Sequence, residues 1–167
     1  MLTTTSGVIR ALLSIAALAA GILASVAALP ASAGERLSGP IPATVEKVID
    51  GDTIAVRVRV WIGQEVLVLV RVAGVDVPEL AKGCAASRAL AIEAKSKVEG
   101  IIEGHQITLF NIQSDKYFGR VVADVRIDGS GDLASLLLAD GLARPYGGKK
   151  RCGWCGEADS CPVASAG

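Results

Sequence analysis

The chain has few of the residues on which many enzymes and nucleic-acid-binding proteins depend. Its 167 residues include one histidine, His105, one methionine, and only two each of tryptophan, tyrosine and phenylalanine. Basic and acidic residues number 17 each, so the formal net charge is zero. This balance excludes a large global positive field, and with it a high-affinity DNA-packaging protein. Any affinity for nucleic acid must come from a local cleft, and its chemistry must be built without histidine.

The first 33 residues differ in kind from the rest. Residues 11–29 carry no charge and are mostly alanine, leucine and isoleucine; Arg10 precedes them and Ala31-Ser32-Ala33 follows. A basic start, an apolar run and a small-x-small site predict a cleaved secretory signal peptide. Since 19 residues just span a bilayer core, a retained signal anchor is the alternative. On either interpretation we expect export, to the periplasm or the medium, with membrane attachment only if the segment is uncleaved.

Cleavage after Ala33 leaves 134 residues (167 minus 33), enough for one domain with one core. Residues 34–42 are rich in glycine, serine and proline and predict a linker. The domain then spans residues 43–146, and residues 147–167 form a cysteine-containing tail. No repeat is visible, and we expect a monomer without a stable protein partner.

Three of the four cysteines crowd the C-terminus. An even number of cysteines in an exported chain predicts two disulfides, and we favour Cys84–Cys155 and Cys152–Cys161. The Cys152-Gly153-Trp154-Cys155 spacing also admits half of a zinc site or a redox pair. A redox pair is disfavoured because the motif lies in a glycine-rich tail rather than at a strand–helix junction.

Hydrophobic patterning predicts an α+β fold that is mainly β. Alternation of apolar and polar residues, and one nearly all-apolar run that we expect to be buried on both faces (Glu65–Val72), indicate five strands. Amphipathic periodicity indicates a helix between the third and fourth strands and a short C-terminal helix. This order matches a five-stranded Greek-key barrel of the OB type. The strands are Ala43–Ile49, Thr53–Ile62, Glu65–Val72, Gln106–Ile112 and Val121–Ile127, and the helices are Ala85–Ile102 and Leu133–Ala139.

Charged residues recur in short motifs that suit the cleavage of a phosphodiester. Carboxylates supply hard oxygen ligands for a cation such as Ca²⁺, and arginines present planar donor forks to phosphate oxygens. Plainer interpretations exist: Asp50-Gly51 as an ordinary turn, Arg71 in a structural ion pair with Asp76 or Glu79, and Glu79 as a solvated loop carboxylate. The run Lys149-Lys150-Arg151 predicts a solvated tail.

Together the motifs resemble the staphylococcal nuclease (thermonuclease) family, exported Ca²⁺-dependent phosphodiesterases built on an OB barrel. The resemblance covers residues 43–146. Any one motif arises by chance, but all of them in order, with compatible spacing, are specific. They are Val48-Ile49-Asp50-Gly51-Asp52-Thr53, Arg71-Val72-Ala73-Gly74-Val75-Asp76-Val77-Pro78-Glu79, Asp115-Lys116-Tyr117-Phe118-Gly119-Arg120 and Gly141-Leu142-Ala143-Arg144-Pro145-Tyr146.

The resemblance implies a Ca²⁺ site with ligands from two motifs. Asp52 and Asp76 would supply carboxylate oxygens, and Val77 its backbone carbonyl. Asp50 and Thr53 would support these ligands from behind, with Asp50 orienting metal-bound water. The family usually has threonine where this chain has Val77, so a hydroxyl near the metal is lost.

The resemblance also implies the catalytic and substrate-binding residues. Glu79 matches the general base that activates water, and Arg71 and Arg120 match the pair that grips the phosphate and stabilises charge in the transition state. Lys116, Tyr117 and Tyr146 would bind the substrate, the tyrosines as platforms for bases. Phe118 is an extra residue relative to the family's motif and bears on where Arg120 lies.

The sequence therefore predicts an exported Ca²⁺-dependent nuclease acting on DNA or RNA. A catalytically inactive OB module that binds nucleic acid or an envelope partner is the alternative, because OB barrels host many binding functions. A binding module has no evident need for a metal pair, a base and two arginines together.

Overall fold

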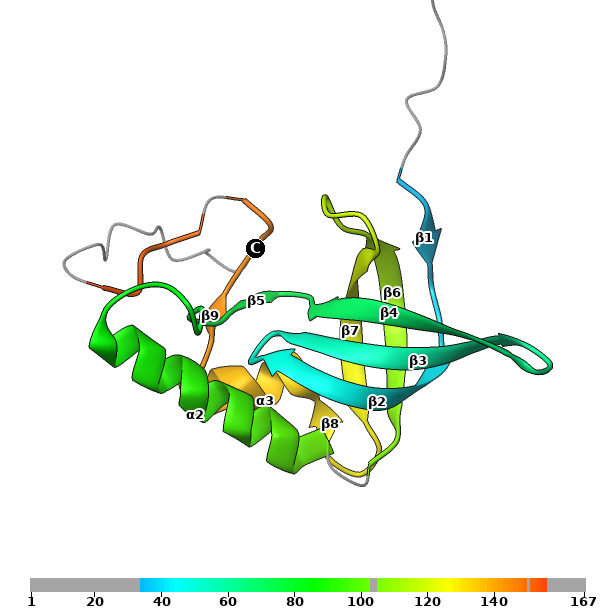
Figure 1. Cartoon of the computed structure of the whole chain (residues 1–167), viewed down its shortest axis with the longest axis horizontal. Coiled ribbons are helices and arrows are strands. Elements are labelled where there is room, and N and C mark those ends of the chain that lie inside the picture. Colours follow the sequence, from blue (N-terminus) through cyan, green and yellow to red (C-terminus); the bar gives the residue numbers. More distant parts are fainter. Residues whose placement is uncertain (1–33, 103–104, 150, 156–167) are drawn as a thin grey trace, which may run out of the picture. The chain divides into compact units, whose positions relative to one another are not determined.

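The structure is a computed structural model that describes residues 34–102, 105–149 and 151–155 (Figure 1). The expected signal peptide or anchor, residues 1–33, lies outside the described residues. Within the described ranges no helix combines the length and apolar character that crossing a bilayer requires.

Five strands close into a barrel, as the sequence predicts (Figure 1). β2, β3 and β4 form an antiparallel meander, β4 pairs in parallel with β7, and β6 closes the barrel by pairing with both β7 and β2. The short β1 and β8 extend the sheet, and β5 pairs with β9. The strands are β1 (Arg36–Leu37), β2 (Ile41–Asp50), β3 (Thr53–Trp61), β4 (Gln64–Val72), β5 (Val75–Asp76), β6 (Ile107–Ser114), β7 (Arg120–Ile127), β8 (Gly131–Asp132) and β9 (Arg144–Pro145).

Two helices cover the described domain where the patterning predicts them. α2 (Ala85–Ile102) follows β4 and β5 and buries a stripe of small and aliphatic residues, Ala91, Ala94, Val98 and Ile102. α3 (Leu133–Ala139) begins at Asp132, whose carboxylate accepts a hydrogen bond from the Ser135 backbone N–H, and it buries Leu133 and Leu137. The fold is thus the predicted mainly β, OB-type α+β fold.

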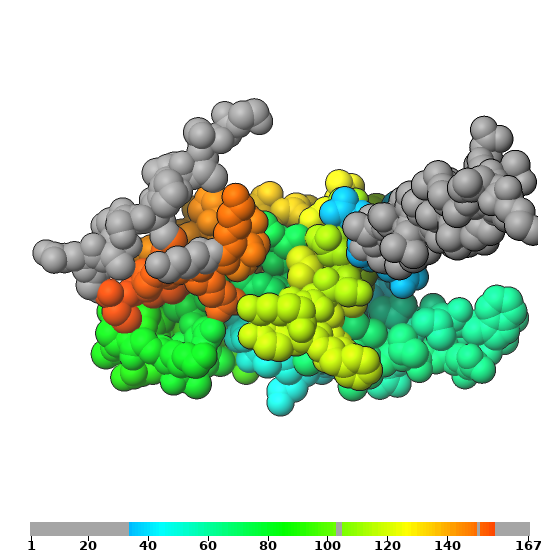
Figure 2. Space-filling view, turned by 90° about the horizontal axis from the view of Figure 1, so that it is seen from above, coloured from blue at the N-terminus to red at the C-terminus, as the bar shows by residue number. Residues whose placement is uncertain are grey.

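Burial along the β3–β4 hairpin corrects the expectation that the apolar run Glu65–Val72 is buried on both faces throughout. The barrel ends of both strands are buried, including Ile54, Val56, Val70 and Val72. The outer half projects from the barrel (Figures 1 and 2), and Trp61 near its tip is 71% exposed. An apolar run therefore predicts burial on both faces only for the part of the strand that lies within the barrel.

The expectation of a linker over residues 34–42 is wrong for the described chain. Arg36 and Leu37 pair with β6, and β2 begins at Ile41, two residues earlier than predicted. The start of the apparent linker thus pairs with backbone groups at the edge of β6, which would otherwise be unpaired.

The chain returns to the barrel after α3. Arg144 and Pro145 pair with β5, and the Tyr146 N–H donates to the Gly74 carbonyl at 2.9 Å. This pairing brings residues 147–149 and 151–155 toward the loop that follows β5. Figure 2 shows this segment in orange beside the green region of α2.

Candidate active site

The turn between β2 and β3 presents the first acidic motif. Asp50 Oδ1 accepts from the Asp52 N–H at 3.2 Å, and Thr53 Oγ1 donates to Asp52 Oδ1 at 3.0 Å. Gly51 allows the turn to pack closely, because a Cβ there would lie 2.7 Å from Val77 Cγ1 and 2.8 Å from Ala94 Cβ. The turn is therefore fixed against the next motif and against α2, with the Asp52 carboxylate held by Thr53.

Arg71 lies in the buried end of β4, opposite Thr53 in the strand register. Its guanidinium donates to Asp52 Oδ2 at 2.5 Å and to the Val75 carbonyl at 3.1 Å. Asp76 Oδ1 lies 3.6 Å away. Of the two partners weighed from the sequence, Asp76 forms an ion pair with Arg71, but the shorter contact is to Asp52, which that interpretation did not name. A guanidinium shared by two buried carboxylates offsets the cost of burying three charges.

Asp76 ends β5 and is almost completely buried, with 5% of its surface exposed. Its Oδ2 accepts from Trp154 Nε1 at 3.0 Å. Its Oδ1 receives no hydrogen bond of acceptable geometry from the described residues, although Arg151 Nε lies 2.9 Å away as an ion pair. A buried carboxylate oxygen with charge contacts alone is suited to a cation.

Glu79 follows Pro78 at the rim of the cleft and carries two ion pairs. Lys82 Nζ lies 2.9 Å from Oε2, and Arg151 donates to Oε1 at 2.7 Å. The hydrogen bond from Lys82, opposed by partial burial and reinforced by the charge of Arg151, lowers the pKa of Glu79. Glu79 is therefore a carboxylate at neutral pH, and both of its oxygens are engaged.

Asp50 has the opposite tendency. Burial, followed by the charge of Asp52, raises its pKa from 3.8 to about 6. Burial beside the charge of Asp52 thus favours the protonated form of Asp50.

The loop before β7 supplies the second expected arginine. Arg120 Nε donates to Asp115 Oδ2 at 2.5 Å, and its guanidinium stacks 4.6 Å from the centre of the Tyr117 ring. Phe118 is fully exposed, and Gly119 adopts a positive φ of 77°, which glycine tolerates at no steric cost. Phe118 thus lies in solvent, and Arg120 lines the same cleft as Arg71.

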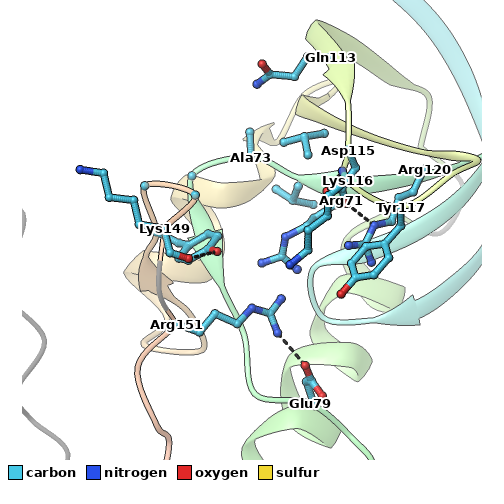
Figure 3. A pocket seen from close by; sticks show the side chains of 16 residues that line it. Arg71, Ala73, Glu79, Gln113, Asp115, Lys116, Tyr117, Arg120, Lys149 and Arg151 are labelled. Atoms are coloured by element: carbon cyan, nitrogen blue, oxygen red, sulfur yellow. Dashed lines mark hydrogen bonds and ion pairs between the residues drawn. The ribbon is translucent and has the colours of Figure 1, made fainter. Parts of the chain in front are cut away.

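The predicted residues converge on adjoining clefts (Figure 3). The larger cleft, of about 790 Å³, is lined by the two arginines, Glu79 and the expected substrate-binding residues Lys116, Tyr117 and Tyr146. The smaller cleft, of about 300 Å³, is lined by Asp50, Asp52, Thr53, Val77 and again Arg71, Arg120 and Glu79. Asp76 lies behind it and lines a neighbouring pocket with Val77. The predicted catalytic, metal-ligating and substrate-binding residues thus line adjoining pockets, whereas Cys161 lies outside the described residues.

The larger cleft is aromatic as well as basic. Arg71 lies 5.6 Å from the centre of the Tyr146 ring, and Lys116 Nζ lies 5.0 Å from that of Tyr117. The Tyr146 hydroxyl donates to the Lys149 carbonyl at 2.6 Å. Two rings flanked by cations suit a base and a phosphate together.

Arg151 is the functional candidate that sequence reasoning missed, and the interpretation of residues 149–151 as a solvated tail is wrong at Arg151. Its guanidinium contacts the carboxylates of Asp76 and Glu79 and lies 3.9 Å from Asp52 Oδ2. Burial opposes its charge, but the neighbouring carboxylates outweigh that effect and raise its pKa. Nothing in the local pattern marks Arg151, although its place beside two cysteines hinted at a tethered segment.

Disulfide bonding holds this segment to the barrel. Cys84 and Cys155 are bonded, as expected, with their Cα atoms 5.9 Å apart. Cys155 is therefore neither a zinc ligand nor half of a redox pair with Cys152. Cys152 is also disulfide-bonded; Cys161, its expected partner, lies outside the described residues, so that pairing stays a prediction.

Comparison with known proteins identifies the family. The profile described as "Staphylococcal nuclease homologue" matches residues 69–153, just over half of the chain. The chain belongs to this family. The match includes Arg71, Asp76, Glu79 and Arg120, and it extends past Tyr146 through Arg151. A search of curated proteins finds no match.

The first acidic motif lies before the matched residues. Asp50 and Asp52 are thus connected to the family by the resemblance of their motif and by their position in the fold. The described residues contain no cluster of three or more acidic, histidine or cysteine side chains arranged around a metal position. A cation at this site would therefore need backbone or water oxygens in addition to Asp52 and Asp76.

Proposed function

We propose that this nuclease homologue is an exported, Ca²⁺-dependent nuclease that hydrolyses phosphodiester bonds of DNA or RNA. One observation carries the proposal: Arg71 and Arg120 line the same cleft as the carboxylates of Asp52 and Glu79. Family membership supports a nucleic-acid substrate and a nuclease-like domain. Two arginines facing carboxylates suit phosphodiester hydrolysis, because the arginines can bind the phosphate and the carboxylates can bind a cation and activate water.

The donors fit a hard divalent cation. Asp52 and Asp76 are buried carboxylates close enough for one guanidinium to touch both, and Asp76 Oδ1 lacks a hydrogen bond from the described residues. With the Val77 carbonyl and water they offer oxygen ligands only, as Ca²⁺ prefers. When bound, the ion would supply positive charge to the phosphate and lower the pKa of water. Asp50 and Thr53 would keep the ligands in place.

In this proposal the chain's own groups perform three tasks. Arg71 and Arg120 bind the phosphate, each oriented by a carboxylate, and stabilise the charge that grows on its oxygens. Glu79, whose lowered pKa keeps it ionised, accepts a proton from the attacking water. Tyr117, Tyr146 and Lys116 hold the adjacent nucleotide by stacking and charge.

The test is cleavage by the purified protein of single-stranded DNA and of RNA, with Ca²⁺ and with EDTA. We expect cleavage that requires the cation and is lost in Glu79→Gln. Glu99→Gln, which changes an exposed glutamate of α2, is the matched control. Cleavage equal in EDTA and Ca²⁺, or an unaffected Glu79→Gln variant, would contradict the proposal.

One observation favours the alternative of a catalytically inactive binding module. Arg151 and Lys82 occupy both oxygens of Glu79, so the candidate base is neutralised in this structure. A module that only binds nucleic acid would bind DNA or RNA without cutting either. The same assay distinguishes the two functions, because binding by gel shift without cation-dependent products supports the module.

Export is part of the proposal. The N-terminal segment has the composition of a signal peptide, and a disulfide between Cys84 and Cys155 is expected in an oxidising compartment. We expect a monomer in the periplasm or medium, beginning at Gly34. Intact mass measurement of protein from fractionated cells would locate it and reveal whether residues 1–33 are retained.

A further inference from the structure

Arg151 lies where the proposed cation would have to bind. Its Nε is 2.9 Å from Asp76 Oδ1, its Nη1 is 2.7 Å from Glu79 Oε1, and its Nη2 is 3.9 Å from Asp52 Oδ2. One guanidinium thus faces both proposed carboxylate ligands and the proposed base. Figure 3 shows it pointing into the cleft from the side opposite Tyr117, with Glu79 at its tip.

The segment that carries Arg151 is attached to the barrel beside the site. The Cys84–Cys155 disulfide joins it to the start of α2. Trp154 donates to Asp76, and Arg144 lies 4.1 Å from the centre of the Trp154 ring. These contacts keep the guanidinium close to the carboxylates, which gives it a high effective concentration there.

The segment that carries Arg151 also permits its side chain to move away from the carboxylates. Residues 151–153 adopt no regular secondary structure, and the Arg151 side chain is 37% exposed, against 8% for Arg71. Release requires no barrel strand to move. By contrast, Arg71 also donates to the Val75 carbonyl and is enclosed by the barrel.

We propose that Arg151 is a tethered internal competitor for the divalent cation: it neutralises Asp52, Asp76 and Glu79 until the ion displaces it. The inference rests on the cation site of the proposed function. The apparent affinity for the ion is the intrinsic affinity multiplied by the fraction of time that Arg151 is away from the carboxylates, so it falls as Arg151 spends more time on them. Displacement also frees Oε1 of Glu79, so cation binding and release of this oxygen become one event, while Lys82 stays paired with Oε2.

Isothermal titration of Ca²⁺ into the chelator-treated protein tests the inference without relying on cleavage. Arg151→Gln should bind Ca²⁺ about tenfold more tightly than the wild type, or better. Lys149→Gln removes the same charge from the same segment. Lys149 lines the cleft but pairs with no carboxylate of the described residues, so this control should change the affinity by less than about threefold.

A second pair of variants tests the tether. Cys84→Ser combined with Cys155→Ser releases the segment and should also tighten Ca²⁺ binding. In the Arg151→Gln background the same cysteine changes should have no further effect, because the competitor is already gone. Circular dichroism and melting curves would establish that each variant is folded.

The outcomes separate this inference from the function on which it rests. Equal or weaker Ca²⁺ binding by Arg151→Gln would overturn the competitor while leaving the cation site in place. An equal gain from Lys149→Gln would also overturn it, since net charge alone would then explain the effect. Absence of Ca²⁺ binding in both wild type and Arg151→Gln would overturn the cation site and the competitor together.

Discussion

Arg71 and Arg151 contact the same carboxylates from opposite kinds of support. Arg71 projects from the buried end of a barrel strand, and two of its partners are themselves fixed by the fold. Arg151 projects from an irregular segment tied to the barrel by one disulfide. The same guanidinium group therefore serves two purposes. Arg71 is fixed by the fold and is part of the site, whereas Arg151 lies on a tethered segment and can occupy or leave the site.

The largest expected effect comes from changing the fixed arginine. Arg71→Lys keeps the charge but loses the planar fork, so we expect cation-dependent DNA cleavage to fall by about 10²–10³-fold. Arg126→Lys, at an exposed position of β7, is the matched control and should be neutral. Arg151→Gln should not reduce cleavage at saturating Ca²⁺. Similar losses from Arg71→Lys and Arg151→Gln would erase the distinction between the two arginines.

Glu79 is where the two regions meet, because the barrel's candidate base is held by the tethered segment. We expect Glu79→Gln to lower the cleavage rate by about 10²–10⁴-fold, since an amide does not accept the proton of the attacking water. Ca²⁺ affinity should not fall, because Glu79 is not one of the proposed ligands and its replacement removes one partner of Arg151. Rates at saturating Ca²⁺ beside calorimetric dissociation constants would separate the two. A variant that keeps its rate and loses affinity would make Glu79 a ligand instead.

The fixed half of this comparison was predictable from the sequence, and the tethered half was not. The barrel strands have alternating or continuous apolar patterns with turn residues between them, so their positions follow from local signals. Arg71 stood out because a charge within an apolar strand needs a partner. Asp50 to Thr53 stood out because their spacing places two carboxylates beside a strand.

Arg151 depends on contacts that no local pattern reports. Its position is set by a bond between Cys84 and Cys155, which are 71 residues apart, and by the short pairing of β9 with β5. A run of basic residues in a glycine-rich stretch is ordinarily solvated. Residues 34–42 were misinterpreted for a related reason, because strand pairing at a sheet edge overrides a composition typical of linkers.

A smaller effect on stability and Ca²⁺ binding is expected from crowding the Asp50–Thr53 turn, which belongs to the barrel. In Gly51→Ala the new Cβ would lie 2.7 Å from Val77 Cγ1, so the Asp50–Thr53 turn must shift. We expect a loss of about 1–3 kcal/mol in stability and weaker Ca²⁺ binding. Gly63→Ala, at the exposed hairpin turn where a Cβ meets nothing, controls for the loss of glycine, although its positive φ of 71° adds strain of its own. Urea titration and calorimetry would measure both. Unchanged Ca²⁺ affinity in a destabilised Gly51→Ala protein would show that the turn does not position the Ca²⁺ ligands.

The smallest effect concerns Asp50 and the pH dependence of the protein's stability in the absence of metal. Because the pKa of Asp50 rises from 3.8 to about 6 on folding, the folded protein retains a proton that the unfolded chain loses between these values. The free energy of unfolding therefore falls as the pH rises through this window. Above pH 6, the ionised Asp50 carboxylate destabilises the folded state. Asp50→Asn removes that cost. After allowance for solvent screening of this partly exposed carboxyl, we expect a gain of about 1 kcal/mol, or roughly 4 °C in Tm, at pH 7.5. The gain should vanish at about pH 3, where Asp50 is protonated in both the folded and the unfolded chain. Melting curves in EDTA at both pH values test this, and a gain that is independent of pH would mean that charge on Asp50 is not its cause.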